Sequence, residues 1–397
     1  STDILFDHPQ EMSSRVAPTI SYFAAFVALG LTTGLLGPTL PTLAQETRAS
    51  LGAISYLFTV RSVGYILGSL RVGQLFDGKS GNRILGLMLT LMALSSALVT
   101  QAANLWALLL LMLVLGAAEG SLDVGANALL VRVHGWGVGP YMNAMHSFFG
   151  VGALIAPLVV ARLTLFAYPA VDSYLVVALL LLPAAGYAFL IAEGDQVQTP
   201  KHRAAVRRPN GFVLLFALLL LLYVGAEVGF AGWIFTYVTE SELGGPTAGA
   251  YLTSLFWGAL TAGRVLTIPL AARVMPTRLI VSSIAGGLLS LSLVILAPRS
   301  ILILGTATVG FGLSMASIFP STLTLASHRM RITGRITGWF VTGASLGATL
   351  IPLIIGQLLQ RFGPQVVIFG TASALLLALI VLKSIVWNRV TGFARGT

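Results

Sequence analysis

The run LLLLMLVLGAAEGSLDVGANALLV, residues 108–131, decides the fold class of this chain. It is long enough to cross a bilayer as one helix, for which about 20 mostly apolar residues suffice. Its polar residues Glu119, Asp123 and Asn127 are spaced four apart, so they share one helix face. Carboxylates in hydrocarbon cost roughly 2.5–3.5 kcal/mol each on insertion scales and usually face a polar cavity or a partner. The run therefore predicts a membrane helix that lines a cavity; the alternative is a structural ion pair that locks helices together.

Composition supports a membrane protein along the whole chain. Hydrophobic residues make up 56% of the 397 residues and charged residues only 9%, whereas a soluble globular chain carries about 25% charged residues. The net charge is +10, but the basic residues are dispersed in short segments between spans, which favours membrane orientation over nucleic-acid binding. There is no cysteine and the five histidines lack metal-ligand spacing, so neither a metal site nor a cofactor is expected.

Breaks at charge clusters and at Pro or Gly turns divide the apolar sequence into twelve predicted helices. We therefore expect an all-α membrane protein with a six-helix bundle over 17–192, a polar linker over 193–210 and a second bundle over 211–387. Short polar segments, 1–16 and 388–397, flank the bundles. The predicted helices cover 17–40, 51–75, 83–101, 105–131, 139–162, 171–192, 211–238, 248–271, 277–297, 300–327, 335–360 and 365–387.

The distribution of basic residues predicts the orientation of these helices. If the N-terminus is cytoplasmic, 17 of the 23 Lys and Arg residues lie in cytoplasmic segments, and only Arg48, Arg162, Arg299 and Arg361 lie on the other side. An excess of Lys and Arg marks the cytoplasmic side. We therefore expect a multi-pass protein of the cytoplasmic (inner) membrane with both termini and the linker in the cytoplasm.

The two halves of the chain repeat each other. GVGALIAPLVVARL (150–163) matches SLGATLIPLIIGQL (345–358) at an offset of 195, and the same offset aligns Gly30, Gly34 and Gly37 with Gly225, Gly229 and Gly232. Parallel six-helix repeats of this kind place a substrate site between the halves, near the middle of the membrane. The repeat therefore predicts two pseudo-symmetric bundles.

The segment GQLFDGKSGNR (73–83) resembles the cytoplasmic loop signature of the major facilitator superfamily, with Gly73, Asp77, Gly81 and Arg83 at the matching positions. The resemblance implies the major facilitator fold and a gating loop in which Asp77 and the basic residues act as a latch. The counterpart in the second half, RVLTIPLAARVMPTRL (264–279), is degenerate.

Three further stretches resemble the fucose–proton symporter group and its sodium-dependent glucose transporter branch. They are LDVGAN (122–127), GPYMNAMHSFFGVGALIAPL (139–158) and YVGAEVGFAGWIFTYV (223–238). The resemblance implies that Asp123 is the coupling acid, that Asn127, Asn143 and His146 are polar positions of the cavity, and that Glu227 is the acid of the seventh helix. It also departs from the fucose symporter pattern, because the first helix has no acid and only Thr32 and Thr33 near its middle. Glu119 is the candidate substitute.

Charge balance within the spans selects among these acids. Arg61 lies at a depth similar to that of Glu119, so we expect an ion pair, since an unpaired buried charge is far costlier. Arg264 should face the interface between the halves, toward the fifth helix or Glu227. Both arginines are interpreted as charge-balancing residues. Three acids against two arginines leave one acid to take H⁺ or Na⁺; Asp123 is the first choice and Glu227 the rival.

Trp233 and Trp257 belong to spans that could line the cavity, where an aromatic face would stack on a sugar ring or on a lipophilic drug. With the resemblance, these features favour a monomeric secondary transporter, not an enzyme, that moves a small polar solute, most simply a monosaccharide, by alternating access coupled to H⁺ or Na⁺. The alternative is a proton-driven exporter of drugs or lipid-linked glycans. The expected partners are the solute and the lipid bilayer, without nucleic acid. Pro320, within FPST (319–322), lies in the middle of the tenth span, where it is expected to remove one backbone hydrogen bond and hinge the helix.

Overall fold

The computed structural model describes residues 9–72, 81–191, 211–330 and 334–393. Over these residues twelve helical segments are long and apolar enough to cross a membrane, which confirms the predicted all-α membrane class. The first half contains α1 (Pro9–Glu46), α2 (Leu51–Ile54), α3 (Tyr56–Val72), α4 (Gly81–Val99), α5 (Leu105–His134), the 3₁₀ turn η2 (Gly135–Gly137), α6 (Val138–Leu165), the 3₁₀ turn η3 (Ala170–Asp172) and α7 (Ser173–Leu190). The second half contains α8 (Gly211–Glu240), α9 (Pro246–Ala271), α10 (Pro276–Leu296), α11 (Ile301–Met315), α12 (Ile318–Ser327), α13 (Gly334–Phe362) and α14 (Val366–Phe393).

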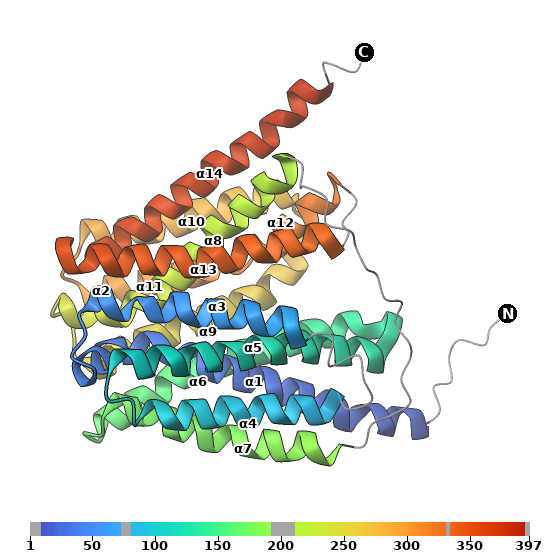
Figure 1. Cartoon of the computed structure of the whole chain (residues 1–397). Helices are drawn as coiled ribbons and strands as arrows, with labels where there is room; N and C mark the ends of the chain where they lie inside the picture. The colour runs from blue at the N-terminus through green and yellow to red at the C-terminus, as the bar shows by residue number, and fades with distance from the viewer. Residues whose placement is uncertain (1–8, 73–80, 192–210, 331–333, 394–397) are drawn as a thin grey trace.

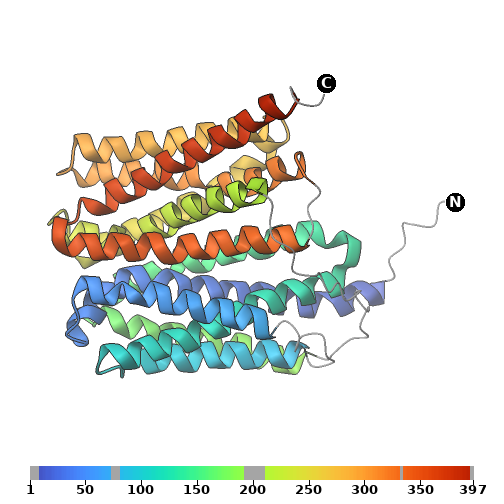
Figure 2. The same ribbon diagram turned by 45° about the horizontal axis from the view of Figure 1, so that its top comes forward.

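The helices form two bundles that lie side by side (Figures 1 and 2). In the first bundle α1 packs on α6, α3 on α5 and α4 on α7; in the second, α8 packs on α13 and α14, and α11 packs on α9 and α10. The bundles meet mainly where α6 contacts α9, with further contacts from α1 to α8 and from α3 to α13. The interface between the bundles is therefore formed by helices of both halves.

The repeat seen in the sequence recurs in the packing of the helices. A Cβ atom on Gly152 of α6 would lie 2.1 Å from the carbonyl oxygen of Val27 on α1. A Cβ atom on Gly347 of α13 would lie 2.0 Å from the carbonyl oxygen of Leu221 on α8. Gly152 and Gly347 are aligned by the offset of 195. Small residues allow membrane helices to approach this closely, so each bundle is built around an equivalent helix pair.

Several helix boundaries differ from the predicted ones. α1 begins at Pro9 rather than near residue 17, since proline is well suited to a first helical turn, and α14 continues to Phe393. The second span is interrupted at Ser55, between α2 and α3. The tenth span is interrupted between α11 and α12, four residues before Pro320, as expected from a ring that clashes with the carbonyl group four residues earlier.

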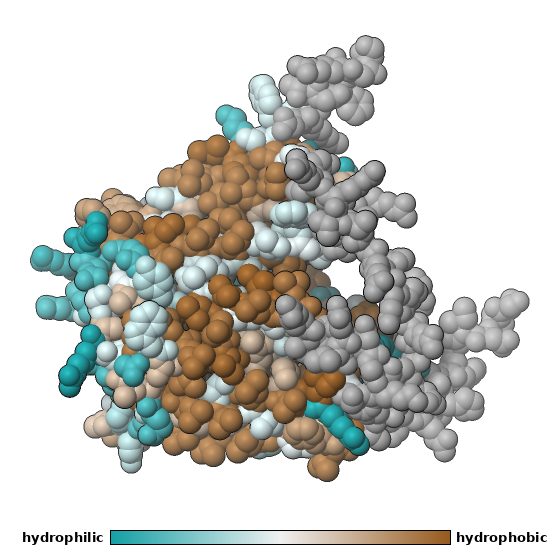
Figure 3. Space-filling view, in the orientation of Figure 1, coloured by the Kyte–Doolittle hydropathy of each residue, from teal (hydrophilic) through white to brown (hydrophobic). Residues whose placement is uncertain are grey.

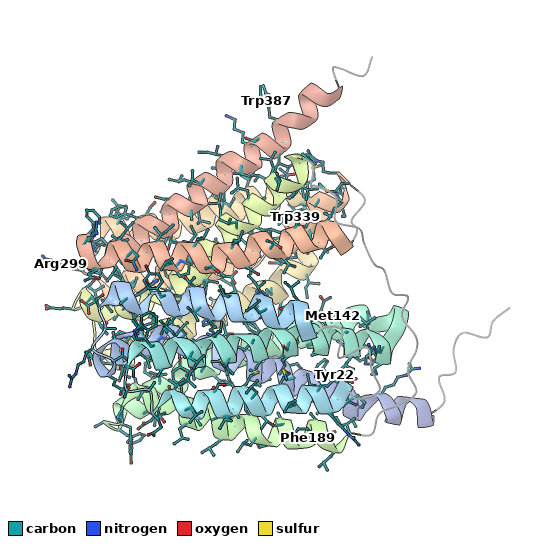
Figure 4. All side chains as sticks on the ribbon, in the orientation of Figure 1. Tyr22, Met142, Phe189, Arg299, Trp339 and Trp387 are labelled. Carbon is teal, nitrogen blue, oxygen red and sulfur yellow. The ribbon has the colours of Figure 1, made fainter. Side chains whose placement is uncertain are left out.

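The surface agrees with a membrane-spanning molecule. Hydrophobic residues cover the middle of the helices, and hydrophilic residues gather at the end that carries α2 (Figure 3). Arg299 lies at this same end, and Trp387 of α14 points away from the bundle (Figure 4). α1 begins and α14 ends toward the opposite end (Figure 1). Of the predicted gating loop, Gly73 and Asp77 lie outside the described residues, whereas Gly81 and Arg83 begin α4, where Arg83 is exposed.

Candidate functional site

A cavity of about 520 Å³ lies between the two bundles. Its walls come from α1, α3, α5 and α6 of the first half and from α8, α9, α12 and α13 of the second. Pockets for small molecules typically measure about 300–1,000 Å³. Predicted site residues from both halves line this cavity: Arg61, Glu119, Asp123, Asn127, His146, Trp257 and Arg264.

Arg61 and Glu119 form a two-pronged ion pair between α3 and α5. The Nε atom of Arg61 donates to Oε2 of Glu119 at 2.8 Å, and Nη2 donates to Oε1 at 2.5 Å. Thr32 of α1 also donates to Oε1 of Glu119, at 2.6 Å. The side chains of Arg61 and Glu119 are 11% and 3% exposed. Glu119 is therefore neutralised and held by two neighbouring helices.

Asp123, one turn farther along α5, accepts hydrogen bonds from neutral groups. The hydroxyl group of Tyr65, one turn after Arg61 on α3, donates to Oδ2 of Asp123. The side-chain amide of Asn127 donates to Oδ1 of Asp123 and to its backbone carbonyl oxygen, each at 2.8 Å. Among the described residues, Asp123 makes no ion pair. Of the two carboxylates that line the cavity, Glu119 and Asp123, it is therefore the one without an ion pair in the described structure.

Two glycines set the register of these pairs. A Cβ atom on Gly116 of α5 would lie 2.0 Å from the carbonyl oxygen of Arg61, and one on Gly120 would lie 2.1 Å from that of Tyr65. Each glycine precedes its acid, Glu119 or Asp123, by three residues. α3 and α5 therefore touch backbone to backbone, directly beside the two acids.

His146 and Arg264 face each other where the bundles meet. The two helices run antiparallel. Ser254 of α9 donates to the carbonyl oxygen of Leu154 of α6 at 2.7 Å, and Thr261, farther along α9, packs on Gly150, one turn back along α6. One turn farther in the same antiparallel register come His146 and Arg264. His146 is exposed in the cavity and lies close enough to Asp123 for their charges to interact. On its other side, Arg264 interacts with Glu227 of α8.

Three residues predicted to bind the solute are not among those that line the cavity. Trp233 is fully buried, and its indole N–H donates to the carbonyl oxygen of Pro352 at 2.9 Å, so its ring packs between α8 and α13. Glu227 is buried and accepts a hydrogen bond from the hydroxyl group of Tyr223. Asn143 is exposed in the first turns of α6. In this conformation these three side chains lie off the cavity wall, and their role in binding stays a prediction.

Other cavity residues were missed by sequence reasoning. Thr33, Ser62 and Ser345 line the cavity but are too common in membrane helices to be selected from the sequence. The hydrogen bond from Tyr65 to Asp123 could have been predicted from the sequence, because Arg61 and Tyr65 are four residues apart, as are Glu119 and Asp123. Two helices that run in the same direction can pair both sets at once.

The bundles are in contact at one end of the cavity. Near α2, the side-chain amide of Gln357 donates to the carbonyl oxygen of Gly52 at 2.6 Å, joining α13 to the first half. At the same end, the hydroxyl oxygens of Thr164, in the last turn of α6, and Thr247, in the first turn of α9, are 3.2 Å apart.

Toward its other end, the described part of the cavity wall is exposed. The cavity residues His146 and Val341 are exposed toward it. Met142 and Trp339 also lie at this end, on α6 and α13 (Figure 4). Within the described residues, the exposed part of the cavity wall therefore lies toward the end at which α1 begins.

Twelve spans in two repeated bundles around a cavity that contains charged and polar side chains are typical of a membrane transporter. Comparison with known families gives the same class: the model of the Major Facilitator Superfamily matches residues 22–352. The chain belongs to the Major Facilitator Superfamily, and it is a transporter rather than an enzyme.

The comparison also identifies similar curated proteins. The chain is 30% identical to sodium-dependent glucose transporter 1 of Danio rerio over 388 residues, covering 86% of this chain and 64% of that protein. It is 29% identical to sodium-dependent glucose transporter 1A of Mus musculus, covering 90% of this chain and 94% of that protein. The human sodium-dependent glucose transporter 1 is 28% identical over 93% of this chain and 78% of that protein.

Solved structures share the fold at low sequence identity. A point mutant of the nucleoside transporter NupG superposes with a TM-score of 0.76 at 14% identity, covering 94% of this chain and 99% of that chain. An inward-facing bacterial homologue of the human lysosomal transporter Spinster superposes with a TM-score of 0.66 at 11% identity, covering 97% of this chain and 96% of that chain. These similarities show the major facilitator fold alone.

Proposed function

We propose that this protein is a secondary active transporter that moves a small polar solute, most directly a monosaccharide, by alternating access coupled to H⁺ or Na⁺. The observation that carries the proposal is the cavity between the bundles, in which Asp123 has no ion-pair partner within the described part of the chain. The names of the similar proteins, sodium-dependent glucose transporters, support a sugar as the solute.

The cavity supplies groups suited to a polyhydroxylated solute. Asn127 offers an amide with donor and acceptor atoms, and His146 offers a ring nitrogen. Trp257, on the opposite wall, offers an aromatic face for the C–H side of a sugar ring. Asp123 takes the coupling ion, because a cation there removes an uncompensated negative charge from a cavity in the membrane. Arg61 and Arg264 balance the charges of Glu119 and Glu227.

We propose an orientation in the membrane from the basic residues at the two ends of the helices. Basic residues at or just beyond the helix ends on the side that carries α2 are few, so we take that side as external; they are Arg48, Arg162, Arg299 and Arg361. The cavity then opens to the cytoplasm, with the ends of the chain on that side. We place the protein in a cytoplasmic membrane as a monomer, with the segment 73–83 as its gating loop.

A second candidate is a proton-driven exporter of drugs or lipid-linked glycans. It is favoured by the phenylalanines of the cavity wall, Phe26, Phe58, Phe149 and Phe319, because an apolar wall would bind a lipophilic solute. The polar wall formed by Arg61, Tyr65, Asp123 and Asn127 favours the sugar.

Uptake into proteoliposomes distinguishes the two candidates. Labelled monosaccharides are offered under an imposed H⁺ gradient, an imposed Na⁺ gradient or neither, with empty liposomes as the control. We expect one sugar to accumulate under one of the two gradients and to be competed by its unlabelled form. Absence of any sugar uptake, together with export of lipophilic cations or dyes, would instead support the exporter.

A further inference from the structure

The guanidinium group of Arg61 has one bonded edge and one open edge. Its Nε and Nη2 atoms donate to Glu119, and Nη2 also lies 3.5 Å from the hydroxyl oxygen of Thr33. Nη1 donates to no acceptor among the described residues, and it is not one of the buried polar atoms that lack a partner there. Because it is neither bonded nor buried, Nη1 is accessible in the cavity that Arg61 lines.

The bonded edge fixes the direction of the open one. Glu119 is held by Thr32 of α1 at 2.6 Å, and Gly116 brings the backbone of α5 against the carbonyl oxygen of Arg61. A guanidinium group is planar and always protonated, so fixing one edge also fixes the donors on the other. Nη1 is thus a preorganised donor of two N–H groups, and a ligand that accepts from it does not have to immobilise a long side chain.

About one helical turn from Arg61, the cavity wall carries a group of hydrogen-bond acceptors. Tyr65 lies four residues after Arg61, which corresponds to about 6 Å along a helix, and it donates to Asp123. Asp123 and Asn127 then offer carboxylate and amide oxygens. A fixed donor and an acceptor site separated by about one helical turn match two hydroxyl groups on one sugar ring, one accepting from Arg61 and the other donating to the acidic site.

We infer that Arg61 is a specificity-determining residue as well as a charge-balancing one: Nη1 donates to one particular hydroxyl oxygen of the solute. The inference rests on the proposed sugar transport and deepens it. A hydroxyl group that meets this donor is recognised individually, because its removal leaves the charged donor without a partner.

Monodeoxy sugars test this assignment. Competition against uptake of the transported hexose is measured for the analogues that lack one hydroxyl group each, in the wild type and in Arg61→Lys. We expect the wild type to bind one analogue roughly 10- to 100-fold more weakly than the hexose, the range for a hydrogen bond to a charged group. In Arg61→Lys this difference disappears for that analogue only, since an ammonium group bound to Glu119 has no second edge.

Two further variants separate specificity from structural support. Thr32→Val removes one bond to Glu119 but keeps both hydrogen bonds from Arg61 to Glu119, which orient the open edge, so the order of preference among the analogues is retained. The double variant Arg61→Gln with Glu119→Gln replaces the ion pair by a neutral pair and should lose the same discrimination as Arg61→Lys. The inference is wrong if Arg61→Lys and the double variant keep the wild-type discrimination, or if Thr32→Val erases it equally. If the wild type carries no monosaccharide, the proposed function fails and this inference with it.

Discussion

Glu119 and Asp123 lie one turn apart on the same face of α5, yet their partners differ. Glu119 receives two hydrogen bonds from Arg61 and one from Thr32. Asp123 receives hydrogen bonds from Tyr65 and Asn127, which are neutral. Bonds to the guanidinium cation compensate the charge of Glu119, whereas a phenol and an amide only partly compensate that of Asp123. We therefore expect the first acid to hold α1, α3 and α5 together and the second to respond to a cation.

This difference predicts unequal effects on stability. Glu119→Gln leaves the Arg61 cation nearly buried without its partner, which should lower the free energy of unfolding by about 3 kcal/mol or more. Asp123→Asn can still form hydrogen bonds with Tyr65 and Asn127, which are neutral, and should change the free energy of unfolding much less. Thermal unfolding of the purified variants in one detergent measures both. Equal unfolding temperatures for Glu119→Gln and the wild type would contradict the assignment of the ion pair as a structural element.

At the scale of elements, the register of α3 against α5 places these side chains. Glycine is required at position 116 because a Cβ atom there would lie 2.0 Å from the carbonyl oxygen of Arg61. At position 186 of α7, by contrast, a Cβ atom would meet no heavy atom within 4 Å. The two positions are both helical glycines, and they differ in the space around them.

Gly116→Ala should therefore push α3 and α5 apart and lower the free energy of unfolding by about 1–3 kcal/mol, the usual cost of overpacking. It should also weaken uptake, because the Arg61–Glu119 pair shifts. Gly186→Ala is the matched control and should be neutral or slightly stabilising, since alanine is favoured over glycine within helices. Similar unfolding temperatures for the two variants would show that the close approach of α3 and α5 is not needed.

The contact between α2 and α13 predicts a second element-scale result. A Cβ atom at position 52 would lie 3.3 Å from the side-chain oxygen of Gln357, and the sequence has no cysteine. In the double variant Gly52→Cys with Gln357→Cys, oxidation should form a disulfide that keeps this end closed and should stop uptake, and reduction should restore it. Each single variant controls for the substitution alone. Full uptake by the cross-linked protein would mean that the halves need not separate at this end.

The sequence predicts the whole molecule better than it predicts the orientation of single side chains. In a bilayer, the backbone N–H and C=O groups of an apolar segment find hydrogen-bond partners by forming a helix. Composition therefore suffices to predict twelve helical spans, and the offset of 195 suffices to divide them into two bundles. The Arg61–Glu119 pair could also be predicted, because an unpaired charge in the membrane is costly and the two residues lie at similar depths in their spans. Trp233 could not be placed in this way, because α8 is buried on nearly every face from Leu222 to Val238 and its pattern does not indicate which face meets the cavity. Pro320 predicts a hinge, and the structure goes further by interrupting the helix just before it, whereas the interruption at Ser55 has no proline signal at all.

Taken as a whole, the described part of the molecule combines a cavity between the bundles with an acid, Asp123, whose hydrogen-bond donors are neutral. Alternating access requires the bundles to part near Gly52 and Gln357 and to meet near His146 and Val341. Coupling then requires that this movement depend on the occupancy of Asp123. A substitution that makes Asp123 permanently neutral should separate the movement of solute from the use of a gradient.

The most direct measurement compares two modes of transport in proteoliposomes that contain Asp123→Asn. In one, the solute accumulates against its own gradient under an imposed ion gradient; in the other, labelled and unlabelled solute exchange without any ion gradient. We predict that Asp123→Asn loses accumulation but retains exchange, while the wild type performs both. Accumulation by Asp123→Asn at the wild-type level would contradict the assignment of Asp123 as the residue that couples the ion to the solute.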